Sequence, residues 1–187
     1  MYSKIKQIII EAHKSFYIKT SGVESTKAKW NKIIFFEMMP AILSIYLILV
    51  PNLIVAKSIV VGYLLTTYSI FAGLLFSLII VIVDKAKKIK ENVNITKEEH
   101  FYYVKRYLRF SKHLITKISF TIILSLVLIV LSLSTQLNFG MHNVWLWLAT
   151  HKSQIISFLI FYFTIQFIIM ILQIVSEMYE VFLEEIK

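Results

Sequence analysis

Two glutamines and one glutamate stand in stretches of the sequence that are otherwise almost entirely apolar. Gln166 and Gln173 lie seven residues apart, and Glu37 precedes Pro40 by three residues. An amide or a carboxylate surrounded by hydrocarbon needs a hydrogen-bonding partner or water. We therefore expect the two glutamines to face either a neighbouring helix, as a hydrogen-bond ladder, or an aqueous conduit.

Charged residues near the ends of these stretches are candidates for ion pairs. The acidic ones continue the glutamine stripe along the same predicted helix, and the basic ones lie between two apolar stretches. Glu37 is separate from both groups, and we expect it to snorkel or to pair with Lys32 or Lys117. The other candidates for ion pairing are Glu177 and Glu180 with Lys105, Arg106 or Arg109.

Small residues recur at helical spacing within residues 58–83. They are three or four positions apart and fall on one face of a helix. Small side chains let another helix approach closely, either within one chain or between copies. Helix packing is the first interpretation of this face, and a narrow pore lining is the second. The residues are Gly62, Thr66, Ser69, Gly73 and Ser77.

Motifs of soluble enzymes are absent from the sequence. It contains no glycine-rich phosphate loop, no HExxH and no GxSxG. It also contains no cysteine, which excludes disulfides, thiol nucleophiles and cysteine-ligated metals. His142 and His151 are nine residues apart, a poor spacing for a metal on a helix. We expect no enzymatic activity, no cofactor and no metal.

The apolar composition indicates that lipid surrounds much of the chain. Of 187 residues, 58% are hydrophobic, against about 45–50% in soluble domains. A hydrocarbon core of about 30 Å takes about 20 helical residues to cross. Four stretches reach or approach this length, and we predict transmembrane spans at residues 33–55, 58–83, 114–134 and 155–176.

Basic residues are distributed unevenly around these spans. Of the 20 Lys and Arg residues, Lys57 and Lys152 are the two that lie in the loops after the first and third spans. The positive-inside rule therefore places both termini, and the loop between the second and third spans, in the cytoplasm. The net charge of +9 is thus mainly a topology signal. It favours contact with an anionic membrane surface, and we do not expect nucleic acid binding.

The predicted fold is an all-α membrane protein with four transmembrane helices. Residues 1–22 form an amphipathic helix that lies in the membrane interface or packs on the cytoplasmic ends of the bundle, and residues 23–187 form the membrane domain. The cytoplasmic loop of residues 84–113 continues its flanking helices as a helical hairpin extension, because no helix breaker follows Asp84. Residues 135–153 form the outer loop.

The layout resembles small membrane proteins of antiphage defence loci. The stretch Tyr68-Ser-Ile-Phe-Ala-Gly-Leu-Leu-Phe-Ser-Leu-Ile-Ile, then Asp84-Lys-Ala-Lys-Lys-Ile-Lys-Glu, and a closing Ile-Leu-Gln-Ile-Val with an acidic tail are similar to the RexB phage-exclusion family. The layout is also similar to KwaA of the Kiwa system and to the accessory membrane protein of type VI-B CRISPR loci. The resemblance implies a membrane component of a bacterial antiphage system, in the inner membrane, with a soluble defence partner encoded nearby. It supplies no catalytic residues.

Two kinds of function fit these features. A homo-oligomeric effector or accessory protein changes membrane permeability when its hairpin moves, or senses infection at the membrane. A scaffold or regulatory subunit recruits a soluble partner and conducts nothing. A small transporter is the third alternative, although coupling carboxylates usually lie near the midplane and Glu37 does not. A conduit requires Gln166 and Gln173 to be wet, whereas a scaffold requires them to be buried and dry.

Overall fold

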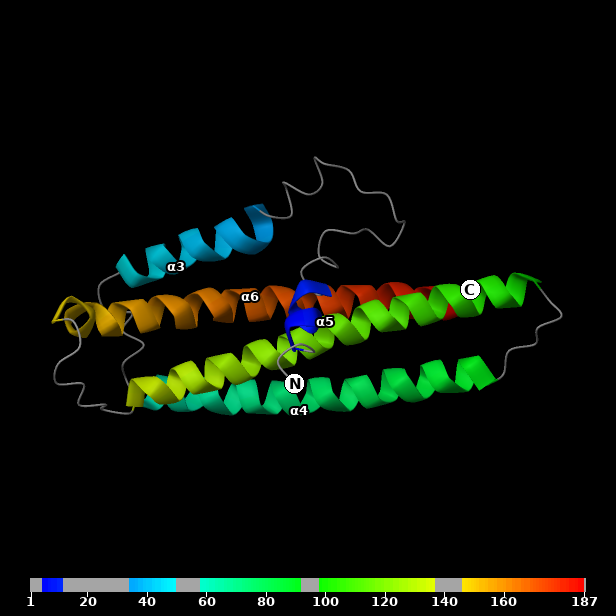
Figure 1. The fold of residues 1–187 in the computed structure, drawn as a ribbon, viewed down its shortest axis with the longest axis horizontal. Coiled ribbons are helices and arrows are strands. Elements are labelled where there is room, and N and C mark those ends of the chain that lie inside the picture. Colours follow the sequence, from blue (N-terminus) through cyan, green and yellow to red (C-terminus); the bar gives the residue numbers. More distant parts are fainter. Residues whose placement is uncertain (1–4, 12–33, 50–57, 92–97, 137–145, 187) are drawn as a thin grey trace.

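The computed structural model describes five ranges of the chain, all of them helical: residues 5–11, 34–49, 58–91, 98–136 and 146–186. Three long helices run along the longest axis of the molecule, and a shorter one lies beside α6 (Figure 1). The elements are the π-helical turn η1 (Ile34–Met38), α3 (Met39–Leu49), α4 (Ser58–Glu91), α5 (Glu98–Gln136) and α6 (Leu146–Ile186).

Three helices are long and apolar enough to cross a membrane. Their apolar parts are Val61–Glu91, Val104–Thr135 and Gln154–Tyr179. A fourth apolar helix, Ile34–Leu49, is shorter. Its 16 residues, five in η1 and eleven in α3, extend about 24 Å along the axis. The end of the predicted first span, residues 50–55, lies outside the described residues.

Of the predicted amphipathic helix of residues 1–22, the structure describes residues 5–11, which are helical. The side chain of Gln7 donates from Nε2 to Glu11 Oε1 over 3.0 Å, one turn away. Ile5, Ile9 and Ile10 are exposed, with 36–44% of their surface accessible. The remainder of this predicted helix lies outside the described residues.

α4 and α5 are antiparallel and pack along a seam with seven-residue spacing. Such spacing keeps one face of a helix toward its neighbour, as in a coiled coil. The buried positions on α4 are Val61, Tyr68, Leu75 and Ile82. The corresponding buried positions on α5 are Val104, Ser111, Ile118, Ser125 and Ser132. Three of these are serines, which allow the two helix backbones to approach closely.

α5 lies between α4 and α6, and a second buried face of α5 contacts α6 (Figure 1). Among the described helices, α4 and α6 meet through side chains and not through close backbone approach. The Tyr68 hydroxyl is 2.6 Å from Thr164 Oγ1. The rings of Tyr68 and Phe71 pack edge-on against Phe167, with centroids 5.5 and 5.9 Å away.

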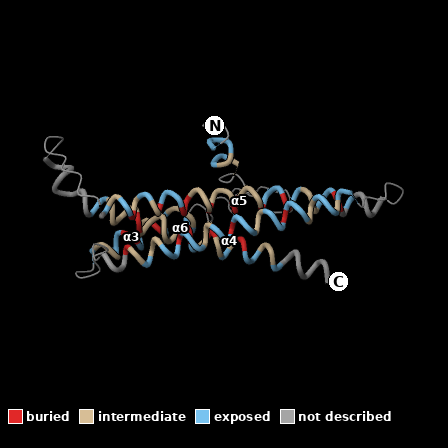
Figure 2. The backbone as a smooth tube through the Cα atoms, turned by 90° about the horizontal axis from the view of Figure 1, so that it is seen from below, coloured by how far each residue is buried: buried red, intermediate tan, exposed pale blue. Residues whose placement is uncertain are grey.

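The outer faces of the helices are largely exposed and apolar (Figure 2). Leu49, Tyr63 and Leu172 have exposed fractions of 74%, 71% and 64%. Contiguous apolar surface of this extent suits lipid or another protein and not water. Figure 2 also shows the last part of α6 diverging from the α4–α5 pair.

Candidate functional site: a polar seam along α6

An ion pair joins α5 to α6. Lys117 Nζ of α5 donates to Glu177 Oε1 of α6, and the exposed fractions of the two side chains are 6% and 23%. Burial of a charge is costly unless an opposite charge accompanies it. The pair therefore ties the two helices together at this level. On the next turn of α5, Thr121 Oγ1 donates to the Lys117 carbonyl over 2.9 Å.

Gln173 extends this ion pair into a small network. Its Nε2 donates to Glu177 Oε1 over 3.2 Å, one turn further along α6. Its Oε1 is buried and has no hydrogen-bond partner among the described residues. The network therefore holds one acceptor that no described protein group satisfies.

Gln166 connects α6 to the first apolar helix. Pro40 has no N–H, so it cannot donate to the carbonyl of Phe36 as the α-helical ladder requires. Gln166 Nε2 donates to this carbonyl over 3.3 Å and also to the Tyr162 hydroxyl over 2.8 Å. A π-helical turn occupies the same segment, residues 34–38. The glutamine thus supplies a donor at the point where the proline interrupts the helix.

The two glutamines proposed as a conduit therefore both donate to protein groups. Gln166 and Gln173 are half-buried, and their amide groups bond a backbone carbonyl, a phenol and a carboxylate. Two of these bonds stay within α6, and the bond from Gln166 to the Phe36 carbonyl reaches another helix. We refer to Lys117, Gln166, Gln173 and Glu177 as the polar seam.

The other predicted ion-pair residues lie elsewhere. The expected partners of Glu177 were Lys105, Arg106 or Arg109, but the structure brings Lys117 to it, one of the two partners expected for Glu37. Arg106 and Arg109 are exposed on the outer face of α5, two to three turns beyond the contact with α6. Glu37 is half-buried in η1. Glu180 belongs to α6, but its side chain lies outside the described residues.

The small-residue stripe of α4 faces outward. A Cβ added at Gly62 or Gly73 would meet no atom within 4 Å. The hydroxyls of Thr66, Ser69 and Ser77 donate to carbonyls four residues back, over 3.0, 2.8 and 3.1 Å. The stripe is therefore open in the described part of a single chain, because the seven-residue seam with α5 lies on another face.

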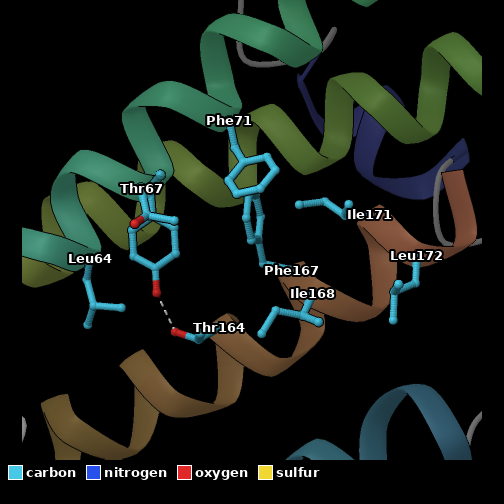
Figure 3. A pocket seen from close by; sticks show the side chains of 9 residues that line it. Leu64, Thr67, Phe71, Thr164, Phe167, Ile168, Ile171 and Leu172 are labelled. Atoms are coloured by element: carbon cyan, nitrogen blue, oxygen red, sulfur yellow. Dashed lines mark hydrogen bonds between the residues drawn. The ribbon is translucent and has the colours of Figure 1, made fainter. Parts of the chain in front are cut away.

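A cavity of about 260 Å³ lies between α4 and α6 (Figure 3). Its hydroxyl groups are already bonded: Tyr68 to Thr164, and Thr67 to the Tyr63 carbonyl over 2.8 Å. The cavity suits an apolar occupant and does not adjoin the glutamines. Its lining residues are Leu64, Thr67, Tyr68, Phe71, Thr164, Phe167, Ile168, Ile171 and Leu172.

Reasoning from the sequence missed both the Tyr68–Thr164 contact and the serine-lined seam. The signal for the seam was the seven-residue repeat that Tyr68, Leu75 and Ile82 form on α4 and that Ser111, Ile118 and Ser125 form on α5. Polar residues on this repeat are packing positions. No comparable signal marks Thr164, because its partner is 96 residues away.

Within the described ranges, no group of three or more His, Cys, Asp or Glu residues is placed to hold a metal ion. His142 and the side chain of His151 lie outside these residues. Comparison of the chain with protein-family models, with curated proteins and with solved structures finds no match. The polar seam and the exposed faces are therefore the features from which function is inferred.

Proposed function

We propose that the chain is a four-span protein of the bacterial inner membrane with both termini in the cytoplasm. Support comes from three helices long enough to cross and from a fourth apolar helix, Ile34–Leu49, that lies against α6. The distribution of basic residues supports the orientation, since Lys57 and Lys152 are the two cations assigned to the outer side.

We propose further that it is an effector or accessory protein of an antiphage system, acting through its bundle. The observation that carries this proposal is the polar seam, because charged and amide groups within membrane helices are costly and usually functional. In the closed bundle Lys117 and Gln173 both donate to Glu177, and Gln166 donates to the Phe36 carbonyl and the Tyr162 hydroxyl. Parting α5 from α6 would separate Lys117 from Glu177 and open a polar surface along α6, which water would occupy and which would raise membrane permeability.

A non-conducting scaffold is the second candidate, and a specific observation favours it. Gln166 and Gln173 are both bonded to protein groups, and the cavity between α4 and α6 offers no free hydroxyl. These contacts favour a chain that conducts nothing in its closed form. In this role the α4–α5 hairpin would recruit a soluble partner encoded nearby.

Copies of the chain would associate through the small-residue stripe of α4. Gly62 and Gly73 have open space in front of them, and the intervening hydroxyls are satisfied within their own helix. A second helix can therefore pack closely here without leaving polar groups unpaired.

The test of the effector proposal replaces both glutamines of the seam. Gln166→Leu with Gln173→Leu keeps similar volume and should insert normally, because leucine is favourable in the bilayer by about 0.5 kcal/mol. Cells expressing the wild type should lose membrane potential on phage infection, and cells expressing the double variant should retain it, as reported by a voltage-sensitive dye. Gln154→Leu is the matched control, since Gln154 is exposed near the other end of the apolar part of α6.

Two results would contradict the effector proposal. If the double variant is expressed normally and depolarises cells as the wild type does, the polar seam is not the conducting path. If neither protein depolarises infected cells, yet both protect the culture, the scaffold is the better description.

A further inference from the structure

The basic residues of α5 just before its longest apolar stretch share one outer face. They follow one another at spacings of one, three and three residues, all are exposed, and the face points away from both buried seams. Tyr102, one turn earlier on the same face, has an exposed fraction of 69%. This basic face consists of Lys105, Arg106, Arg109 and Lys112.

The register of the α4–α5 pair sets this basic face beside apolar residues. Lys85 Nζ lies over the Tyr107 ring, 5.9 Å from its centroid. The two helices are antiparallel, so a step of two residues back from Lys85 matches a step of two residues forward from Tyr107. Val83 is therefore level with Arg109. Val83 has an exposed fraction of 45%. At this level α4 exposes Val83 and, one residue further on, Asp84, whereas the outer face of α5 is cationic.

The same contrast holds one turn closer to the middle of the helices. Ile80 precedes Lys85 by five residues, and Lys112 follows Tyr107 by five. Ile80 and Lys112 are therefore also level with each other. Ile80 has an exposed fraction of 51%, and its neighbour Val81 one of 61%. At this end of the hairpin, exposed apolar residues of α4 therefore lie beside exposed basic residues of α5.

The uncharged segments of α4 and α5 differ in length, and this difference explains why apolar residues of α4 lie beside basic residues of α5. Residues 58–83 of α4 carry no charge over 26 residues, about 39 Å of helix, whereas the core is about 30 Å thick. Residues 118–136 of α5 carry no charge over 19 residues, about 28 Å. Tilting the bundle fits the longer segment of α4 to the core. It keeps α4 in hydrocarbon as far as Val83 and brings the basic face of α5 to the headgroup layer.

We propose that Arg109 and Lys112, supported by Lys105 and Arg106, bind the phosphate groups of anionic lipids. Arg109 and Lys112 precede the membrane-depth residue Lys117 by eight and five residues, about 12 and 8 Å along the helix. Long basic side chains reach headgroups from this height with their stems on apolar surface. A guanidinium binds phosphate through two parallel hydrogen bonds, and an ammonium binds it as a point charge.

This proposal rests on the proposed cytoplasmic placement of the hairpin and not on a change in permeability. A soluble polyanion is the competing partner. A soluble polyanion would bind the cations farther from the membrane at least as strongly as those of the basic face. The far end of α4 offers these cations, because Lys87 lies level with Lys105 and Lys90 lies level with Tyr102. Both lysines are exposed.

The test titrates phosphatidylglycerol, or phosphatidylcholine for comparison, into the detergent-solubilised full chain and counts bound lipids by native mass spectrometry. The wild type should prefer phosphatidylglycerol. Arg109→Gln with Lys112→Gln should weaken its binding about ten- to thirtyfold at low ionic strength and leave phosphatidylcholine unchanged. The matched control, Lys87→Gln with Lys90→Gln, removes the same charge farther out and should stay within about threefold of wild type.

Raising the salt from 0.1 to 1 M shortens the screening length from about 10 to about 3 Å, so the preference of the wild type should shrink without any substitution. A wild type with no preference for phosphatidylglycerol would overturn the proposal. An equal loss in the two double variants would also overturn it, and heparin binding that depends on Lys87 and Lys90 would then identify a soluble polyanion. Cells that keep their membrane potential in the depolarisation experiment leave this test unaffected.

Discussion

Lys117 and Glu177, sixty residues apart in the sequence, form an ion pair between two helices that both belong to the apolar bundle. The lysine is the more deeply buried of the two, with 6% of its side chain exposed. Separating the pair would take the carboxylate away from a lysine that is almost fully buried. The closed arrangement of α5 and α6 therefore depends on both.

Removing one member of this pair should cost more than removing both. Glu177→Leu removes the carboxylate that accepts from the buried Lys117, and we expect a loss of about 3–5 kcal/mol in stability. The double variant Lys117→Met with Glu177→Leu should recover most of it. Unfolding in detergent, followed by circular dichroism, measures both, and Glu91→Gln, at an exposed site, is the control. A double variant as unstable as the sum of the single ones would show that the pair does not couple the helices.

The hydrogen bond from Gln166 to the Phe36 carbonyl should matter only while Pro40 is present. Gln166→Leu should destabilise the protein by about 1–2 kcal/mol, because this carbonyl loses a donor. In a Pro40→Ala background the backbone regains an N–H at position 40, and the same substitution should cost less. Thermal unfolding of the four proteins in the cycle gives the coupling. Equal costs in both backgrounds would mean that Gln166 does not compensate for the proline.

Gly73→Leu should separate copies of the protein without unfolding a single chain. A Cβ at Gly73 would meet no atom within 4 Å, so we expect the leucine to be tolerated in a single chain, while it would prevent close approach of a second helix. We expect a smaller particle by size-exclusion chromatography with light scattering, at unchanged melting temperature. Val81→Leu, on an exposed part of α4, is the control. An unchanged particle size would place the stripe against lipid.

The orientation can be tested directly because the chain contains no cysteine. Single cysteines at Asn94 and Asn143 should react oppositely with an impermeant thiol reagent, with Asn143→Cys labelled in intact cells and Asn94→Cys labelled only after lysis. The basis is the excess of Lys and Arg on the predicted cytoplasmic side. Labelling of Asn94→Cys from outside would reverse the proposed topology.

The all-helical class and the long apolar helices were predictable because they depend on local properties. Apolar length and the absence of breakers are enough to carry α4 from Ser58 through Asp84 to Glu91. The choice of packing face was harder. Gly62 and Gly73 are typical of a helix contact, yet Tyr68 and Leu75 fill the seam with α5, because serines on α5 leave room for them.

The partners within the polar seam were not predictable in the same way. From the sequence alone, Lys105, Arg106 and Arg109 were equally suitable partners for Glu177. Which cation meets the carboxylate depends on where α5 crosses α6, and packing contacts along both helices set that point. The role of Gln166 likewise depends on a carbonyl 130 residues away.

α6 is continuous from Leu146 to Ile186, a single helix of 41 residues and therefore a rod about 62 Å long. A rod of this length acts as a lever. A rotation of about 5° around the Leu146 end would displace the Ile186 end by roughly 5 Å, about one helical turn. Glu177 lies three quarters of the way along this helix. A slight reorientation of the first turns of α6 would therefore displace Glu177 far enough to separate its carboxylate from Lys117.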